Sequence, residues 1–340
     1  MLPNGPESAV ACFAIAAAST CAPLNPAYSE AEFEFYLSDL MPKALVLPPG
    51  FAPSAAAAAR KLRLPVIHLR TDPARPVGTF DLEGDFAPGP PQAVEFTRSV
   101  DVALVLHTSG SAARPKMVPL THANLCASSR NIAASLSLQP SDRCLNIMPL
   151  FHIHGLIGAV LSSWSAGASV AAMPGLQAPQ FFDWVKEFQP TWYTAVPAIH
   201  QSILTRARQL PSARGTSLRF ARSCSSTLAP KLMADVEDAL GVPLVEAYGM
   251  TEASHQMAVN PLPPGARKPG SAGRAAGCCV AIMDGFGNLL VPTKSAKWSF
   301  GAKMSLRGTK TIRMPIKRPS SAVGSSPAIK VGWTTKGTCS

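Results

Sequence analysis

Short apolar runs alternate with helix-like stretches along most of this 340-residue chain, and this alternation restricts the fold more than any other feature. We interpret eight runs as buried strands: ALVLP (44–48), PVIHL (65–69), VALVLH (102–107), RCLNIMPL (143–150), ASVAAMP (168–174), TWYTAV (191–196), LRFARSC (218–224) and PLVEAYG (243–249). Helices are predicted over 7–19, 29–40, 54–62 and 121–138, the second opening with a capping box at Ser29 and Glu32. Strands that alternate with helices predict a mainly parallel sheet and an α/β fold.

Polar stretches follow four of the predicted strands. They are TSGS after VALVLH, FHIHG after NIMPL, SCSST after LRFAR and GMTEASH after VEAY. Ligands of open α/β sheets bind at the carboxyl ends of the strands. The four stretches are therefore expected to meet in one crevice.

The stretch LHTSGSAARPK (106–116) permits two interpretations. It could be an ordinary Ser/Gly connection between a strand and a helix. It could also be a phosphate cradle, in which backbone N–H groups around Gly110 and the hydroxyls of Thr108, Ser109 and Ser111 donate to phosphate oxygens while Lys116 adds a positive charge. The stretch has neither the Walker spacing nor GxGxxG, so a nucleotide loop here belongs to another class.

Charge and cysteine content exclude several classes of protein. Of the net charge of +11, +10 lies in residues 291–340, which contain no acid, so residues 1–290 are almost neutral. No nucleic-acid-binding motif accompanies this basic tail, and a nucleic-acid partner is not expected.

The cysteines and the N-terminal segment bear on the compartment. The eight cysteines include no CxxC pair, and no apolar run is long enough to span a membrane. No basic residue precedes Lys43, so the charged start of a signal peptide is missing. We expect a cytoplasmic protein, with the peroxisome as the alternative compartment.

Two motifs resemble those of the adenylate-forming (AMP-binding) enzymes, which include acyl-CoA synthetases, firefly luciferase and peptide-synthetase adenylation domains. TSGSAARPK is similar to the Ser/Thr/Gly-rich phosphate loop of that family, and YGMTE (248–252) matches its Tyr-Gly-x-Thr-Glu run. MPLFHIHGL, RSCSSTLAP and EAYGMTEASHQM are most similar to the oxalate–CoA ligases of plants and fungi. The resemblance implies an ATP-dependent acid–CoA ligase that uses ATP, Mg²⁺ and CoA on a small carboxylic acid, oxalate being favoured.

The resemblance also implies a role for individual residues. The ATP-binding set would be Thr108, Ser109, Gly110, Ser111, Lys116, Ser225, Ser226, Thr227, Tyr248, Gly249 and Thr251. Within it, the loop would hold the β- and γ-phosphates, Tyr248 would stack on adenine, and Thr251 would contact the α-phosphate. Glu252 would hold Mg²⁺, a hard ion that binds one or two carboxylates together with phosphates. Thr251, Glu252 and His152 form the expected catalytic set.

The acid site is expected to use His154, Ser223 and His255. A dicarboxylate as small as oxalate needs donors at both ends, whereas a fatty acid needs an apolar tunnel. A structural histidine satisfied in the core is the alternative for each imidazole, and His152 is an alternative gate for the pocket.

We expect a large adenylate-forming domain over residues 1–292, with two α/β subdomains and the start of a small β subdomain, including a hairpin around Asp284-Gly285. Its first strands and the mobile C-terminal domain of the family are expected to be absent, and Ala112 and Ala113 stand where many relatives carry Thr and Gly or Ser.

Residues 293–340 are expected to be a disordered tail without a strand or helix period. Codons can be chosen so that a displaced frame of the tail spells family motifs, which suggests a frameshift as a hypothesis. The alternatives to an oxalate enzyme are an inactive fragment that at most binds nucleotide, a 4-coumarate- or medium-chain-type ligase, and a nucleic-acid binder that uses the tail.

Overall fold

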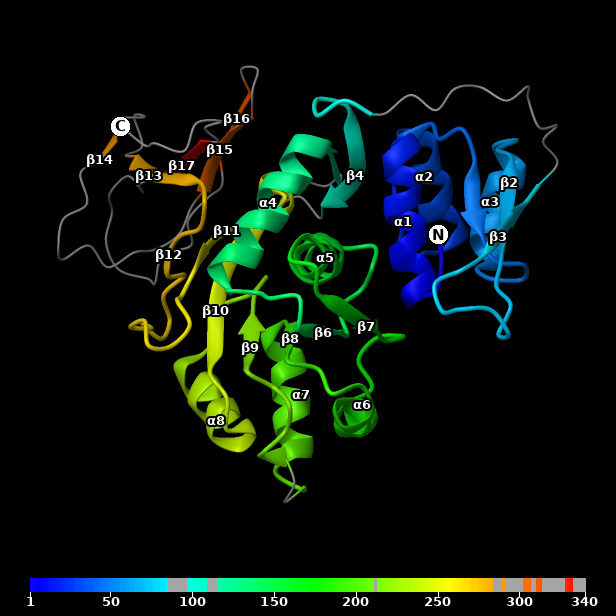
Figure 1. Cartoon of the computed structure of the whole chain (residues 1–340). Helices are drawn as coiled ribbons and strands as arrows, with labels where there is room; N and C mark the ends of the chain where they lie inside the picture. Colours follow the sequence, from blue (N-terminus) through cyan, green and yellow to red (C-terminus); the bar gives the residue numbers. More distant parts are fainter. Residues whose placement is uncertain are drawn as a thin grey trace.

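The computed structural model describes residues 1–84, 97–108, 115–210, 213–283, 289–290, 302–306, 310–313 and 328–332. The N-terminal part of the chain consists of α1 (Pro6–Ala18), α2 (Glu30–Leu40), β1 (Leu45–Leu47), α3 (Pro53–Lys61), β2 (Val66–Arg70) and β3 (Asp81–Glu83). Its strands form a small sheet in which β1 and β2 are parallel and β3 is antiparallel to β2. These blue elements lie together at one side of the molecule (Figure 1). The capping box of α2 is confirmed, because Ser29 N–H donates to Glu32 Oε2 at 2.8 Å and Glu32 N–H to Ser29 Oγ at 3.4 Å.

The stretch that contains the predicted phosphate loop folds as a hairpin. Strands β4 (Val102–Thr108) and β5 (Lys116–Thr121) are antiparallel and form a two-stranded sheet of their own. Helix α4 (His122–Ser135) follows directly and is capped by Thr121, whose Oγ1 accepts from the N–H of Asn124 at 3.2 Å. The predicted helix start at Thr121 is thus confirmed. VALVLH, which was expected to be a strand of the parallel sheet, instead forms β4. Its backbone hydrogen bonds are made with β5, which runs antiparallel to it.

A seven-stranded sheet forms the centre of the molecule. Its elements are β6 (Arg143–Asn146), η1 (His154–Leu161, a π-helix), α5 (Ser162–Ser165), β7 (Ser169–Ala172), η2 (Ala178–Gln180), α6 (Phe181–Phe188), β8 (Trp192–Ala195), α7 (Pro197–Ala207), β9 (Phe220–Ser223), α8 (Pro230–Leu240), β10 (Leu244–Met250), η4 (Thr251–Ala253), β11 (His255–Val259) and β12 (Arg274–Ala275). The strand order is β12-β11-β10-β9-β8-β6-β7. The five strands from β7 to β10 are parallel, and β11 and β12 extend the sheet in antiparallel fashion. The predicted α/β class is confirmed.

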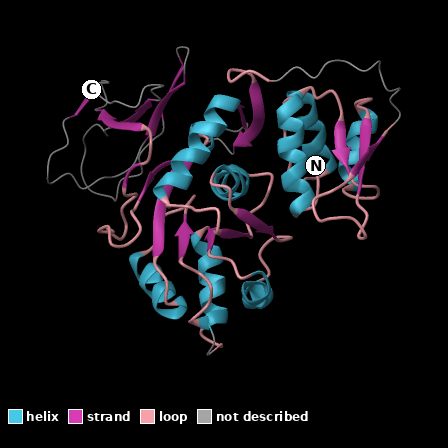
Figure 2. Ribbon diagram, in the orientation of Figure 1, coloured by secondary structure: helices cyan, strands magenta, loops and turns pink. Residues whose placement is uncertain are grey.

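Helices cover both faces of this sheet (Figure 2). Side chains alternate between the two faces along each strand, so neighbouring residues enter different cores. Trp192 and Phe220 pack with α1, the hairpin, α4 and η1, whereas Tyr193 and Ala221 pack with α6, α7 and α8. This alternation decides below which of the predicted site residues can meet.

The C-terminal part contains β13 (Cys279–Met283), β14 (Leu289–Leu290), β15 (Ala302–Leu306), β16 (Lys310–Arg313) and β17 (Ala328–Gly332), in the order β14-β13-β17-β15-β16. The expected hairpin is confirmed by the antiparallel pairing of β13 with β14, while its turn at 284–285 lies outside the described residues. Three short strands occur in the tail, where the sequence shows no strand period. Disorder of the remaining tail, the domain boundary at 292 and the frameshift stay predictions. Among the described helices, none has the length and apolarity needed to cross a bilayer.

Candidate functional site

The mouth of the β4–β5 hairpin holds two of the predicted phosphate ligands. Thr108 is the last residue of β4 and is paired with Lys116, the first residue of β5. Lys116 is exposed, and within the described chain it forms no salt bridge. Its ammonium group can therefore bind an anion without first breaking an ion pair. Ser109, Gly110 and Ser111, together with Ala112 and Ala113, lie outside the described residues.

The YGMTE run turns the chain from β10 into β11. Tyr248 and Gly249 sit at a register shift between these strands. A Cβ at Gly249 would overlap the carbonyl oxygen of His255, so only glycine permits this close approach. Thr251 and Glu252 occupy η4, which lies beside β5. The Thr-Glu pair and the Lys116 strand are therefore neighbours, although they are far apart in the sequence.

The charges of this region suit a magnesium nucleotide. Glu252 is half-buried and, like Lys116, it forms no salt bridge to a described residue. One carboxylate beside a free lysine fits a metal ion that takes most of its ligands from phosphates and water. Among the described residues, no group of three or more metal-ligating side chains occurs. Burial raises the pKa of Tyr248, with Cys224 and Glu252 adding to the shift, so its phenol stays neutral.

The loop after β9 carries three of the predicted ATP-binding residues. Ser225, Ser226 and Thr227 are all exposed. Ser225 has φ +73°, in the left-handed region, and its Oγ lies 3.1 Å from His154 Nδ1. The hydroxyl of this serine therefore has a histidine partner.

Behind these loops, the structure brings two of the predicted acid-site histidines together. His154 and His255 are buried, with ring centroids 4.9 Å apart. Between the sheet and these rings lies Arg222 of β9, also fully buried. Its guanidinium donates to His255 Nε2 at 3.2 Å, to Thr194 Oγ1 at 3.0 Å and to Gln256 Oε1 at 2.9 Å. Thr194 Oγ1 lies 2.7 Å from His154 Nε2, so one hydrogen-bonded network joins both imidazoles to the arginine.

Burial and positive charge keep both imidazoles neutral. Burial is the largest cause that holds the pKa of His154 and that of His255 well below the ordinary histidine value, and the charge of Arg222 adds to it. His255 also has φ +99°, and the preceding Ser254 has φ +54°. Left-handed backbone at non-glycine residues is costly and gathers at functional sites, and here it occurs at Ser225, Ser254 and His255.

Two predicted residues, Ser223 of the acid site and His152 of the catalytic set, take no part in these side-chain hydrogen bonds. Ser223 follows Arg222 in β9 and, by the alternation of the strand, faces the α7 and α8 side together with its register partner Ala195. Its Oγ is buried and has no hydrogen-bond partner among the described residues. His152 is exposed, and its Nδ1 accepts from the N–H of His154 at 3.3 Å. The roles of Ser223 and His152 stay predictions that no side-chain contact with the network supports.

Three members of the network were not predicted from the sequence: Thr194, Arg222 and Gln256. An arginine inside the apolar run LRFARSC was the available signal, because a charge in a buried strand needs partners or a ligand. Gln256 lies in β11, a fully buried strand with the sequence HQMAV. Because this strand begins with two polar residues, its sequence does not indicate a buried strand.

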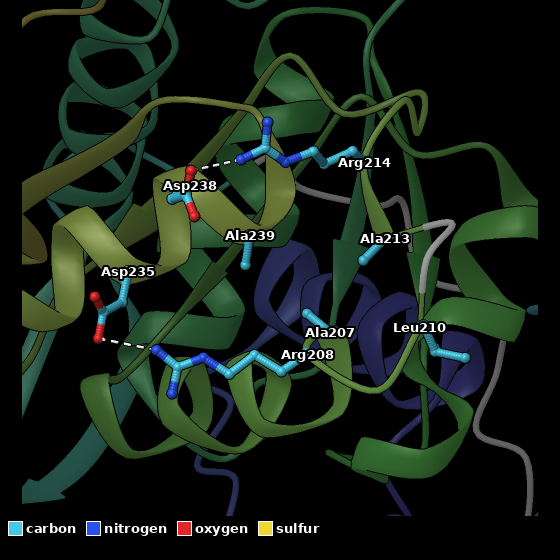
Figure 3. A pocket seen from close by; sticks show the side chains of 8 residues that line it. All are labelled: Ala207, Arg208, Leu210, Ala213, Arg214, Asp235, Asp238 and Ala239. Atoms are coloured by element: carbon cyan, nitrogen blue, oxygen red, sulfur yellow. Dashed lines mark hydrogen bonds and ion pairs between the residues drawn. The ribbon is translucent and has the colours of Figure 1, made fainter.

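A surface hollow of about 230 Å³ between α7 and α8 is not the predicted site (Figure 3). It is lined by the C-terminal end of α7, and because α7 runs back from the carboxyl end of β8, this end lies at the amino edge of the sheet. Its charges are already paired, Arg208 with Asp235 at 3.1 Å and Arg214 with Asp238 at 2.5 Å.

A second cavity, of about 520 Å³, lies among α1, α2, β1 and the hairpin. Its lining is mainly apolar and contains none of the predicted site residues.

Comparisons with known proteins point to the same chemistry. The family described as AMP-binding enzyme matches residues 1–296. An oxalate–CoA ligase of Arabidopsis thaliana is 43% identical over 292 residues, covering 83% of this chain and 56% of that protein. An oxalate–CoA ligase of Saccharomyces cerevisiae is 40% identical, covering 80% and 54%. The crystal structure of ATP-bound MatB from Rhodopseudomonas palustris superposes with a TM-score of 0.70 at 26% identity, over 84% of this chain and 56% of that one. The chain thus spans about half the length of the relatives that it matches.

Proposed function

The chain belongs to the AMP-binding enzyme family, and from this premise we propose that it binds Mg·ATP and activates a small carboxylic acid, oxalate being favoured, as an AMP-forming acid–CoA ligase. The observation that supports the proposal is that η4, with Thr251 and Glu252, lies beside β5, which begins at Lys116, and directly precedes β11, whose His255 imidazole packs against that of His154. The similarity to two oxalate–CoA ligases supports the choice of acid. We propose the cytoplasm as the compartment, with the peroxisome as the alternative.

The chemistry runs in two steps. An oxygen of the acid's carboxylate attacks the α-phosphorus of ATP, and the bond to the leaving pyrophosphate breaks. The thiol of CoA then attacks the acyl carbon, and AMP leaves. In this reaction the protein mainly positions the reactants and neutralises the charge that builds up on phosphate oxygens.

Each residue of the site has a part in these steps. Lys116 and the hydroxyl of Thr108 would hold the terminal phosphates, and Thr251 would donate to the α-phosphate. Glu252 would hold Mg²⁺, which supplies charge neutralisation when bound. Tyr248 would stack on adenine, and the neutral imidazoles would donate hydrogen bonds to the acid without competing for its proton.

Binding and turnover are tested separately. Titration calorimetry should detect Mg·ATP binding by this chain, and Lys116→Ala and Glu252→Gln should each weaken it on the order of tenfold, because each removes a charge-assisted contact. Lys186→Ala is the matched control, since this lysine is equally exposed on α6 and should leave the affinity unchanged. Release of pyrophosphate is then measured with oxalate, 4-coumarate and octanoate.

The outcomes separate the alternatives. Oxalate-dependent pyrophosphate release supports the ligase. Binding of Mg·ATP without release supports the nucleotide-binding fragment, and release with only 4-coumarate or octanoate reassigns the acid. Equal effects of Lys116→Ala and Lys186→Ala would show that the nucleotide site lies elsewhere.

A further inference from the structure

Arg222 is a buried cation with only neutral partners. Its side chain is fully buried, and its guanidinium donates hydrogen bonds to Thr194, His255 and Gln256, with the Cys224 side chain as a further neighbour. Burial keeps three neighbouring ionisable groups neutral as well, since it lowers the pKa of His154 and of His200 and raises that of Cys144. Burial lowers the pKa of Arg222 from its very high ordinary value, yet a guanidinium keeps its proton at neutral pH. A buried charge without a counterion favours binding of an anion.

The same guanidinium decides which nitrogen of His255 carries the proton. Arginine can only donate hydrogen bonds, so the Nε2 atom that it contacts must be a lone-pair acceptor. His255 is neutral, and its single proton must then lie on Nδ1. The left-handed backbone at His255 and the absence of a side chain at Gly158, where a Cβ would overlap the ring, hold the imidazole in this position.

Thr194 transmits the same constraint to His154. Its Oγ1 accepts a hydrogen bond from Arg222 and is fully buried, so its own O–H needs an acceptor. The acceptor available in the described structure is His154 Nε2 at 2.7 Å. The proton of His154 then lies on Nδ1, which faces Ser225 Oγ at 3.1 Å.

His200 provides an internal contrast. Its Nε2 lies 3.2 Å from the backbone carbonyl of Arg222, which can only accept, and its Nδ1 lies 3.0 Å from the hydroxyl of Tyr193. His200 must therefore carry its proton on Nε2. The network thus predicts opposite tautomers for histidines in the same core.

We propose that Arg222 is the positioning residue of the acid site, which fixes His255 and His154 as neutral Nδ1–H donors and supplies the buried positive charge that favours a dianionic acid over a monoanionic one. This inference rests on the proposed function for the identity of the ligand, and on the hydrogen bonds alone for the tautomers. The tight packing around His255 suits an acid of few atoms, such as oxalate.

The charge is tested with two acids of the same skeleton. Oxalate carries two carboxylates, whereas oxamate carries one carboxylate and one neutral amide. Calorimetry on the full chain with Mg·ATP present should show oxalate binding about tenfold tighter than oxamate. Arg222→Lys should keep most of this preference and Arg222→Met should bring the ratio close to one, while Arg208→Met, an exposed arginine at the opposite edge of the sheet, should not change it.

The tautomers are tested without any ligand. Long-range ¹⁵N–¹H spectra at neutral pH should show Nδ1–H for His255 and His154 and Nε2–H for His200. In Arg222→Lys the tautomers should persist if the ammonium group still reaches His255, and in Arg222→Met the Nδ1–H form of His255 should lose its dominance. This readout does not depend on whether Arg222→Met folds, because the wild-type spectrum already decides the pattern.

Different results overturn different statements. Nε2–H on wild-type His255, or an oxalate preference that survives Arg222→Met, would overturn the role of Arg222. Failure of the wild type to bind Mg·ATP would overturn the proposed function. The tautomers of His255 and His154 would still test whether Arg222 positions these imidazoles, because that readout needs no ligand. Equal affinity of the wild type for oxalate and oxamate would refute the selection by charge.

Discussion

At the scale of single residues, the candidate site depends on backbone positions that few side chains tolerate. Ser225, Ser254 and His255 have left-handed φ angles, and Gly249 lies against the carbonyl oxygen of His255. Such conformations persist only where the surrounding structure holds them. They place the turn after β10 and the loop after β9 next to the buried imidazoles.

Gly249→Ala tests this close approach. The added methyl group overlaps backbone atoms that cannot rotate away, so the free energy of unfolding should fall by about 2 kcal/mol or more. Urea unfolding followed by circular dichroism measures the change. Gly215→Ala, at φ +75° but with open space around it, should lose only about 1 kcal/mol from its backbone conformation. Equal losses at the two positions would mean that β10 and β11 separate easily, and that the turn is not rigid.

At the scale of elements, one carboxylate joins the amino ends of several central strands. Asp142, just before β6, accepts from Thr191 Oγ1 at 2.6 Å and from Arg219 Nε and Nη2 at 2.9 and 2.8 Å. Thr191 precedes β8 and Arg219 precedes β9. Burial would raise the pKa of Asp142, but the hydrogen bonds from Arg219 and Thr191 outweigh it, and the pKa is lowered. Since the polar loops lie at the other edge, this clamp stabilises the sheet without entering the site.

Asp142→Asn should therefore destabilise the fold and leave the nucleotide affinity of the folded protein unchanged. The carboxylate is buried but the Arg219 side chain is 42% exposed, so the loss of these charge-assisted hydrogen bonds should lower the free energy of unfolding by about 2 kcal/mol in urea at pH 7. A carboxylate with a lowered pKa contributes stability above its unfolded pKa and loses it as the pH falls through the folded value, so the difference from wild type should shrink below about pH 4. Asp235→Asn, in the exposed pairs with Arg208 and Lys231, should cost under about 1 kcal/mol. A loss for Asp142→Asn no larger than that for Asp235→Asn would contradict the clamp.

At the scale of the whole molecule, buried neutral histidines make stability depend on pH. Burial lowers the pKa of His200 to about 4, and His154 and His255 are held well below their ordinary value. Below about pH 6.5 these histidines bind protons in the unfolded chain but stay neutral in the folded chain. The free energy of unfolding should therefore fall below pH 6.5 by up to about 1.4 kcal/mol per pH unit for each histidine. The midpoints of urea unfolding at pH 7.5, 6.5 and 5.5 measure this dependence of stability on pH. The variant His255→Gln should reduce its slope. Equal midpoints at all three pH values would contradict the prediction.

Much of the architecture could be predicted from local pattern. The runs that become β6, β8 and β9 are apolar and buried, and the caps at Ser29 and Thr121 place two helix starts. Strand β5 contains Pro119 and β11 contains His255 and Gln256, so neither shows a strand pattern.

The candidate site was harder to predict, because its contacts depend on the faces of strands. Ser223 and Arg222 are adjacent in the sequence, yet the alternation of β9 sends them to opposite sides of the sheet. Arg222 bonds to Thr194 and Gln256, which lie 28 and 34 residues away along the chain. No spacing in the sequence indicates this network, since neighbouring strands in the sheet are separated by whole helices.

Residue-resolved NMR during a titration with Mg·ATP can decide whether the nucleotide binds at the carboxyl edge of the central sheet. If it does, the backbone signals of Thr108, Lys116, Tyr248 and Thr251 should shift together and saturate at one dissociation constant. Signals of Arg208 and Arg214, in the hollow of Figure 3, should stay unchanged. Saturable shifts at Arg208 and Arg214, with Lys116 and Thr251 unaffected, would place the nucleotide at the opposite edge of the sheet and contradict the account.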